Sequence, residues 1–313
     1  MHYPLKKQIN LINYLTHQQI DKAKWNECIE HSLNPLIYGY SWYLDEAAPN
    51  WDALVLDDYE AVFPLTHARK YFINYLYQPL FTQQLGLFYK NLIGAEELEN
   101  FINSIPKKFR FVDIALNESN HFETERIDLI KRKNYVLDLE KNYSKLSKSF
   151  TDHTLRNIKK SKKNSLKIIP QNYTDTIQLY VGQKSEQTLK VTLEDYSRFS
   201  KIVGAIQKNA QINCLGITNE KNEIIASAIF SISNNRITYQ MGVSTKEGRE
   251  KRAMYFLFDH IIEQYSEQKY LLDFEGSDIT GIAQFFKGFG ATKSIYYKLR
   301  INNLPWYVKW LKN

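Results

Sequence analysis

The chain has 313 residues and carries 41 Lys and Arg against 34 Asp and Glu, which gives a formal net charge of +7 and a pI near 9.0. Its 43% of hydrophobic residues predict two core-forming domains or one large one, and they exclude a scaffold that depends on disulfides or a metal. The positive charge favours an anionic partner, namely a phosphate-bearing cofactor, nucleic acid or an acidic lipid surface, with an ordinary basic surface as the alternative.

Cysteine and histidine usage predicts no metal site. Cys28 and Cys214 lie far apart without CxxC spacing, and the seven histidines show neither a triad nor a metal-ligand spacing. Sparse cysteine fits a reducing compartment. No stretch has the length and apolarity of a membrane span or a signal peptide, so a cytoplasmic protein is expected.

The first half predicts strands followed by a helix and a further strand. Residues 51–70, "WDALVLDDYEAVFPLTHARK", are typical of strand, turn and strand, and "QQLGLF" follows. A helix is expected around residues 95–105, and "FRFVDIAL" is expected to form the next strand.

Residues 142–167 predict a helix that joins the halves. Its expected cap is Thr151 or Asp152, and six cations crowd its second half, Arg156, Lys159, Lys160, Lys162, Lys163 and Lys167. Such a run indicates either a solvated helix face or an anion-binding face. We therefore predict one domain over residues 1–141 and a second, beginning with this basic helix, over residues 142–313.

The second half repeats the order of the first. Strands are expected at residues 212–218, 224–232 and 237–243, with Asn234-Asn235 as a tight hairpin turn because Asn tolerates positive φ. Ile237, Tyr239, Met241 and Val243 alternate and are expected on one face. A helix with its apolar stripe from Met254 to Tyr265 follows, and then the strand "YLLDFEG".

Two short matches in the same order indicate an internal duplication. Gln84-Leu85-Gly86-Leu87 aligns with Gln240-Met241-Gly242-Val243, 156 residues later, and "FVDI" at residues 111–114 aligns with "LLDF" at residues 271–274, 160 residues later. Repeated order predicts two copies of one α/β unit.

The order of strand, hairpin, strand, loop, helix and strand resembles the Gcn5-related N-acyltransferase (GNAT) fold. The tandem pair, the linking "RNIKKSKK" helix and the late "LDFEG…FFKGFG" run resemble the FemABX-like acyltransferases, and among them the arm-less relatives described as BioF2-like acetyltransferases. "YGYSWYLD" at residues 38–45 is similar to the acceptor-side segment of that family. The resemblance implies tandem GNAT-like units of α/β (α+β) class, with mixed central sheets flanked by helices and a cleft between the domains. It implies a degenerate acceptor-side first domain and a donor-side, catalytic second domain.

The donor phosphates are expected at residues 244–254, "STKEGREKRAM". A helix N-terminus offers unpaired N–H groups to a phosphate, and this loop adds the cations Lys246, Arg249, Lys251 and Arg252. The family loop that cradles coenzyme A has more glycines, and Gly248 and Ala253 stand near its positions here. The corresponding loop of the first half, "FYKNLIGAEE", has one lysine and two acids, so the second copy is expected to bind phosphate. A plain polar loop before a helix is the alternative.

Three charged residues are candidates for the reaction itself. Asp273 and Glu275 are expected on one face of the "YLLDFEG" strand, where one could accept the amine proton or hold the acceptor. Asp113 repeats Asp273 in the first half, which equally fits a structural ion pair, whereas Glu275 aligns with Ala115. By resemblance Lys287 steadies negative charge at the reaction centre, and the alternative is a helix-end lysine that faces the dipole.

Aromatic and amide side chains suit a sugar, an amino acid or a peptide as acceptor. The candidates for the acceptor site are therefore Trp42, Gln83, Gln84, Tyr239 and Gln240. The sequence therefore predicts an N-acyltransferase that uses acyl-CoA, no metal and an amine acceptor, which could be a peptidoglycan precursor. Two alternatives stay open: a FemX-like transferase that uses aminoacyl-tRNA on a cell-wall precursor, and a non-catalytic module that binds RNA or another anionic ligand.

Overall fold

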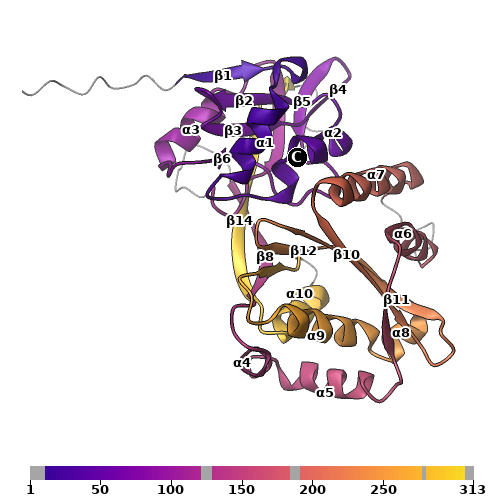
Figure 1. The fold of residues 1–313 in the computed structure, drawn as a ribbon. Helices are drawn as coiled ribbons and strands as arrows, with labels where there is room; N and C mark the ends of the chain where they lie inside the picture. The colour runs from indigo at the N-terminus through magenta and orange to yellow at the C-terminus, as the bar shows by residue number, and fades with distance from the viewer. Residues whose placement is uncertain (1–10, 121–128, 184–190, 277–279, 307–313) are drawn as a thin grey trace, which may run out of the picture. The chain divides into compact units, whose positions relative to one another are not determined.

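The computed structural model describes residues 11–120, 129–183, 191–276 and 280–306 (Figure 1). It confirms the predicted α/β class, with mixed sheets flanked by helices. Contacts between residues divide the chain into two compact units: unit 1 is Met1–Lys131 with Tyr296–Asn313, and unit 2 is Arg132–Ile295. The acceptor-side and donor-side roles assigned to residues 1–141 and 142–313 stay predictions.

Unit 1 contains two sets of strands and several short helices. The first set has the order β1-β2-β3-β6, with β1 at Ile12–Leu15, β2 at Asp52–Leu56, β3 at Ala61–Leu65 and β6 at Phe88–Tyr89. The second has the order β4-β5-β7-β14, with β4 at His67–Lys70, β5 at Ile73–Tyr77, β7 at Phe109–Ala115 and β14 at Thr292–Asn302. The helices are η1 at His17–Gln19, α1 at Lys22–Glu30, η2 at Ile37–Gly39, α2 at Ser41–Ala47 and α3 at Ala95–Asn103.

Unit 2 contains one mixed set of strands with helices on both faces. The strand order is β8-β13-β12-β11-β10-β9, with β8 at Leu129–Asp138, β13 at Leu271–Asp273, β12 at Arg236–Ser244, β11 at Ile224–Ser233, β10 at Gln211–Thr218 and β9 at Lys167–Pro170. The helices are α4 at Tyr143–Ser147, α5 at Asp152–Ser161, α6 at Tyr173–Gly182, α7 at Leu193–Asn209, α8 at Lys246–Glu250, α9 at Ala253–Tyr265 and α10 at Thr280–Gly288.

Local sequence signals account for several of these elements. Asn234 and Asn235 form the two-residue turn between β11 and β12 with φ of 49° and 56°, as their tolerance of positive φ predicts. The side chain of Thr151 caps α5 by accepting a hydrogen bond from Thr154 N. The prediction of this hairpin and this cap is confirmed.

The predicted duplication is confirmed in the strand topology. In unit 1, β7 is parallel to β5 and antiparallel to β14. In unit 2, β13 is parallel to β12 and antiparallel to β8. The aligned aspartates, Asp113 and Asp273, therefore lie on equivalent strands. In each unit this antiparallel neighbour comes from a distant part of the chain: β14 is the last strand in sequence, and β8 precedes the other strands of unit 2.

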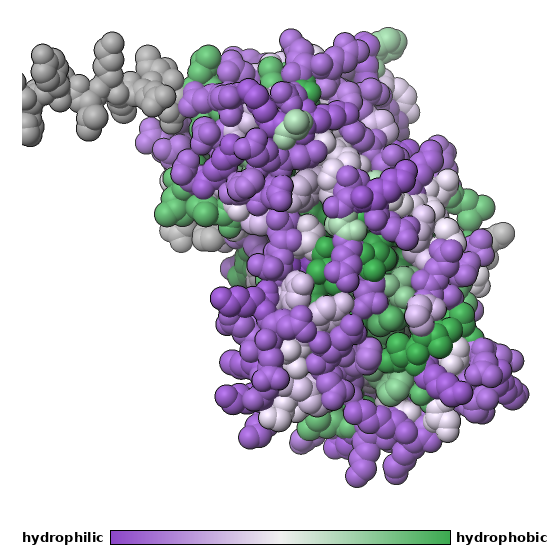
Figure 2. Space-filling model, in the orientation of Figure 1, coloured by the Kyte–Doolittle hydropathy of each residue, from purple (hydrophilic) through white to green (hydrophobic). Residues whose placement is uncertain are grey.

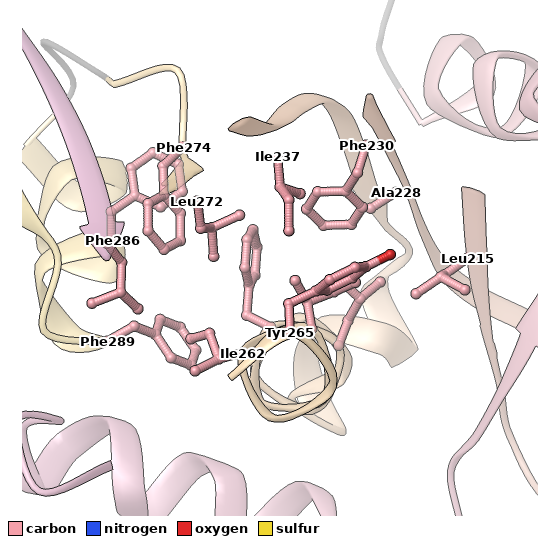
Figure 3. Close-up of a cluster of buried hydrophobic side chains, with 14 of the residues drawn as sticks. Leu215, Ala228, Phe230, Ile237, Ile262, Tyr265, Leu272, Phe274, Phe286 and Phe289 are labelled. Carbon is pink, nitrogen blue, oxygen red and sulfur yellow. The ribbon is translucent and has the colours of Figure 1, made fainter. Parts of the chain in front are cut away.

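The core of unit 2 forms between the sheet and α9 (Figure 3). Phe258, near the middle of α9, is fully buried and its ring lies 5.3 to 5.9 Å from those of Phe274, Phe230 and Phe289. On the opposite face, Thr176 of α6 contacts the hydroxyl of Ser227 at 2.6 Å. The sheet is thus covered on both sides, which explains the nearly continuous burial of β11.

The two glycines of "KGFG" are required by packing. A Cβ on Gly288 would lie 2.3 Å from Thr154 Oγ1, and a Cβ on Gly290, where φ is 77°, would lie 2.1 Å from Ser149 Oγ. The backbone N–H of Thr151 also donates to the carbonyl of Gly288 at 2.9 Å. The start of α5 therefore docks directly on the end of α10, and glycine makes this approach possible.

We expect Gly288→Ala to destabilise unit 2 by about 1–3 kcal/mol, because an added methyl at a tightly packed contact forces α5 away from α10. Gly281→Ala in the same helix is the matched control, since a Cβ at Gly281 would meet no atom within 4 Å. That control should be neutral or slightly stabilising because Ala has the higher helix propensity. Urea unfolding of both variants checks the prediction, and equal midpoints would contradict it.

Candidate functional site

Strand β12 changes its pairing halfway along its length. It pairs with β13 only through residues 236–238, whereas its pairing with β11 continues to Ser244. The register shifts where Tyr239 faces Phe230 and Met241 faces Ile229, so Gln240 is the extra residue of a β-bulge. Bulges that end pairing and re-aim side chains are common beside functional sites. The edge of β12 beyond Tyr239 is therefore the candidate site of unit 2.

The bulge also reverses the alternation that the sequence predicted. Ile237 and Tyr239 pack in the cluster under α9, whereas Met241 and Val243 lie outside this cluster. The expectation that all four side chains share one face is wrong, because the extra residue shifts the two-residue period.

Tyr239 lies at the centre of the candidate site. Its ring contacts those of Phe258 and Phe286 at centroid distances of 5.1 and 6.3 Å. Its hydroxyl lies over Gly242, where a Cβ would approach to 1.9 Å, so only glycine leaves room for the phenol. Burial raises the pKa of Tyr239, and the nearby Tyr180 and Glu275 raise it further. The phenol therefore keeps its proton at neutral pH and can act as a donor.

Gln240 carries a buried acceptor that is unsatisfied. Its Nε2 donates to Ser231 Oγ at 3.0 Å, while its Oε1 is buried and makes no hydrogen bond. Among the residues described, few buried side-chain atoms share this state, and burying an unsatisfied amide oxygen costs stability. An N–H group of a ligand would satisfy it.

Asp273 is committed to structural contacts. It is 1% exposed and accepts hydrogen bonds from Arg236 Nε at 2.8 Å, from Asn134 Nδ2 at 2.9 Å and from the backbone N–H of Glu275 at 2.8 Å. Both carboxylate oxygens are thereby occupied. Asp113, its counterpart in unit 1, likewise pairs with Lys298 at 2.8 Å and Arg300 at 3.3 Å. This arrangement favours the structural alternative raised for both aspartates.

Glu275 stands in a strained turn directly after β13. The strand ends at Asp273, and Glu275 and Gly276 both adopt left-handed backbone with φ of 55° and 53°. The expected continuation of the strand is wrong, and with it the alternation argument that related Glu275 to Asp273. Gly276 is required because a Cβ there would lie 2.4 Å from the carbonyl of Lys133. A left-handed glutamate is unfavourable, and such strain is concentrated at functional sites.

Lys287 lies in the last turn of α10 and faces Tyr135 of β8. Its Nζ lies 5.5 Å from the ring centroid of Tyr135, and its side chain is exposed next to the buried Phe286. Ser277, Asp278 and Ile279, expected to start this helix, lie outside the described residues. The structure therefore places Lys287 at a helix end over an aromatic ring, where both the dipole and the ring favour its charge.

The loop predicted to bind phosphate forms a short helix, α8, ahead of α9. Thr245 caps α8 by accepting from the backbone N–H of Gly248 at 3.1 Å. A Cβ on Gly248 would lie 2.1 Å from the carbonyl of Ile225, so this glycine serves close packing on β11. Lys251 is paired with Glu220 at 2.5 Å and Glu247 at 3.0 Å, which neutralises its charge.

Arg252 connects α8 to α9 in left-handed backbone, with φ of 61°. The N-terminus of α9 has no side-chain cap, although its next residue, Ala253, is fully buried. Arg249, Arg252 and Lys246 are all exposed around this helix start. The guanidinium of Arg249 donates to the carbonyl of Ser244, and that of Arg252 to the carbonyl of Arg249, which holds both beside the helix start.

The candidates in unit 1 form a separate group. Trp42 of α2 stacks on Tyr40 at 5.1 Å with 18° between the rings and is partly exposed. Gln84 is fully buried, where it donates to Gln83 Oε1 at 2.7 Å and accepts from the backbone N–H of Glu118 at 2.7 Å. Gln83 and Trp42 are thus the partly exposed members of this group.

Sequence reasoning missed the residues that organise the site. Arg236 and Asn134 hold Asp273, and Tyr180 approaches Tyr239 from α6. Nothing local marks them, because Asn134 lies 139 residues before Asp273 and reaches it only through the pairing of β8 with β13. The described residues contain no group of three or more His, Cys, Asp or Glu side chains that could hold a metal ion.

We expect Arg236→Met to destabilise unit 2 by about 3 kcal/mol or more, because it leaves the buried Asp273 carboxylate without its charge partner. The double variant Arg236→Met/Asp273→Asn should recover part of this loss, since no uncompensated charge then remains. Lys24→Met, which breaks an exposed pair with Asp58, is the control and should change the melting temperature little. A single variant as stable as the parent would refute the structural role of the pair.

Comparisons with known proteins bear on the fold. No protein-family model and no curated protein sequence matches the chain. Three solved structures are similar to it over nearly the whole length. FemX matches 91% of this chain and 96% of its own at 11% identity and a TM-score of 0.61. A conserved protein of unknown function from Bacteroides thetaiotaomicron matches 93% of this chain and 100% of its own, at 11% identity and a TM-score of 0.62. L-PGS from Bacillus licheniformis matches 93% of this chain and 95% of its own, at 14% identity and a TM-score of 0.57.

These similarities confirm the predicted resemblance to the FemABX-like fold. At 11–14% identity they establish the shared architecture and leave the chemistry to be argued from the residues.

Proposed function

We propose that this protein is an N-acyltransferase that moves an acyl group from acyl-CoA to an amine, with donor and catalytic groups in unit 2. The observation that carries the proposal is the bulged edge of β12, where Tyr239, Gly242 and the strained Glu275 come together. Acyl transfer as the reaction class is supported by the fold shared with FemX and L-PGS. A further structure of this fold is described as the C-terminal domain of a putative lysylphosphatidylglycerol synthetase from Agrobacterium fabrum.

The donor phosphates would bind at the start of α9. Its uncapped N–H groups and positive dipole end favour an anion, and Arg249, Arg252 and Lys246 supply exposed cations there. Lys251 contributes less, because Glu220 and Glu247 already neutralise it. Gly248 and Ala253 would act through packing that fixes α8 and the first turn of α9.

The thioester would extend along the open edge of β12. Backbone N–H groups on the stretch of β12 that extends beyond its pairing with β13 would stabilise the oxyanion that forms when the amine attacks the thioester carbonyl. The attacking amine must lose a proton, and Glu275 is the carboxylate proposed to accept it. The C–S bond then breaks, and the protonated Tyr239 can donate its proton to the leaving thiolate.

The remaining predicted residues receive supporting roles. Asp273 positions Glu275 by accepting its backbone N–H, and Lys287 adds positive potential from the end of α10. Gln240 could bind an N–H of the donor or acceptor through its unsatisfied oxygen. Trp42, Gln83 and Gln84 are proposed to contribute to the acceptor site, with a sugar, amino acid or peptide amine as acceptor.

The aminoacyl-tRNA alternative is favoured by one observation, the basic surface of α5. Its cations Arg156, Lys159 and Lys160 are exposed, as is Lys163 just beyond the helix, while Lys162 at the C-cap is paired with Asp259 at 2.7 Å. A polyanion could bind there through several phosphates. A melting-temperature screen with coenzyme A, charged tRNA and an RNA oligonucleotide distinguishes the donors, because a ligand stabilises the state that binds it.

We expect Arg249→Ala/Arg252→Ala to weaken coenzyme A binding about tenfold or more, because charge-assisted hydrogen bonds to phosphate are lost. The salt dependence of binding should become weaker in parallel. Lys251→Ala in the same loop is the matched control and should change affinity little. Calorimetric titration measures all three proteins, and unchanged affinity in the double variant would rule out this loop as the phosphate site.

We expect Tyr239→Phe to lower kcat about a hundredfold while the protein stays folded, because the variant keeps the ring and removes the proton donor. Since the pKa of Tyr239 is raised, the parent should show no loss of rate from its ionisation at mildly alkaline pH. Pre-steady-state assays with acetyl-CoA and a panel of amines provide the measurement. Full turnover by the variant would contradict the role of Tyr239 as a proton donor and would show that its ring serves packing alone.

A further inference from the structure

The tip of the β4–β5 hairpin in unit 1 exposes two aromatic side chains. Lys70 faces Ile73 across the hairpin, so Tyr71 and Phe72 form its two-residue turn. Phe72 is 89% exposed and Tyr71 is 76% exposed, which places both among the most exposed large hydrophobic residues described. A pair of adjacent aromatics at a protruding tip contributes nothing to either core.

The backbone at this tip disfavours the residues it contains. Tyr71 and Phe72 both have positive φ, 49° and 61°, which is the geometry of a type I′ turn. Asn and Gly are the residues that tolerate it, and bulky side chains there are strained. The chain uses Asn234-Asn235 at the equivalent two-residue turn between β11 and β12, with φ of 49° and 56°. The β4–β5 turn therefore retains aromatics against the local preference, and such violations are expected at functional sites.

Positive charge accompanies the two rings. The Arg69 guanidinium lies 5.4 Å from the ring centroid of Phe72, and Lys70 Nζ lies 5.4 Å from that of Tyr71. Both cations are exposed. The sequence contains no Asp or Glu between Glu60 and Glu96, so both cations lie in a long acid-free stretch of the sequence. The tip thus combines two exposed aromatic side chains with the two exposed cations Arg69 and Lys70.

We propose that the Tyr71-Phe72 tip docks this protein on the surface of an anionic lipid bilayer. Aromatic side chains partition into the headgroup region, and flanking Arg and Lys pair with lipid phosphates. A bilayer fits better than single-stranded nucleic acid for two reasons. Proteins bind a nucleic-acid backbone along a basic groove, and a hairpin tip forms no such groove. Bases also stack on free aromatic faces, and here a cation already covers one face of each ring. Figure 2 shows that the visible face of unit 1 is largely hydrophilic, with a few separate apolar patches. None of the described helices is long and apolar enough to span a membrane.

Vesicle co-sedimentation tests the proposal with the full chain. We expect binding to vesicles of phosphatidylcholine with a quarter phosphatidylglycerol, and weaker binding to pure phosphatidylcholine. Tyr71→Asn/Phe72→Gly should reduce binding to the anionic vesicles at least about tenfold, because the variant loses the two aromatic side chains that would be buried in the headgroup region of the bilayer. The same variant should be at least as stable as the parent in thermal unfolding, since it installs the residues that the turn prefers.

Two further variants separate the contributions. Arg69→Gln/Lys70→Gln should weaken binding to anionic vesicles about fivefold per cation and should remove most of its salt dependence. Leu193→Asn, at a site 68% exposed in unit 2, is the control for loss of exposed apolar surface and should bind as the parent does. Failure of the parent to bind anionic vesicles, or parent-like binding by the aromatic variant, would overturn the proposal. Tip-dependent binding of an RNA oligonucleotide without vesicle binding would also overturn it.

Discussion

The buried ion pair between Asp273 and Arg236 is the contact on which the candidate site depends. Arg236 is the first residue of β12 and Asp273 the last residue of β13, so the pair joins the two strands within the short stretch where they run in parallel. Asn134 adds β8 to the same carboxylate. With these strands held at this point, β12 can bulge at Gln240 and leave β13 without loss of the sheet. The backbone N–H of Glu275 donates to the same Asp273, so the ion pair also fixes the strained turn.

The sequence predicted the elements that local rules determine and missed those that depend on distant contacts. Asn234-Asn235 and the apolar stripe of α9 are local signals that predicted their elements within one or two residues. Thr151 correctly marked the start of α5, but the helix expected over residues 142–167 is divided into α4 and α5 and ends at Ser161, before strand β9. The bulge at Gln240 was missed because alternation looks the same with or without an extra residue until the partner strand is known. Strand β8 was missed because "LIKRKNYVLD" is half charged or polar. The burial of its Tyr135 and Leu137 depends on the core of unit 2 and on pairing with β13, both of which involve residues distant in sequence.

The candidate site residues show the same division. Repetition of Asp113 at Asp273 correctly raised a structural alternative, and the ion pairs of both residues now favour it. The glycines of "KGFG" looked like a helix end, yet they serve equally as the surface on which α5 docks. A motif can therefore be specific to a family because of packing, and its position beside reactive groups does not by itself assign chemistry. The sequence could not distinguish Tyr239 from an ordinary core residue, because a tyrosine on an apolar strand is usually buried packing. The groups that help to raise its pKa, Tyr180 and Glu275, come from other elements.

The β11–β12 and β4–β5 hairpins, which both have a two-residue turn, allow strain to be compared within one protein. Both close with two residues of positive φ, and both connect adjacent antiparallel strands. The β11–β12 hairpin lies in unit 2, where its Asn pair minimises strain and lets Arg236 begin β12 in register with Leu271. The β4–β5 hairpin has no such constraint, because β4 is an edge strand whose tip packs against neither core. Selection for stability alone would favour Asn or Gly at both turns. The aromatic pair at Tyr71-Phe72 therefore indicates a requirement other than folding, and the exposed cations beside it indicate the charge of the surface that it meets.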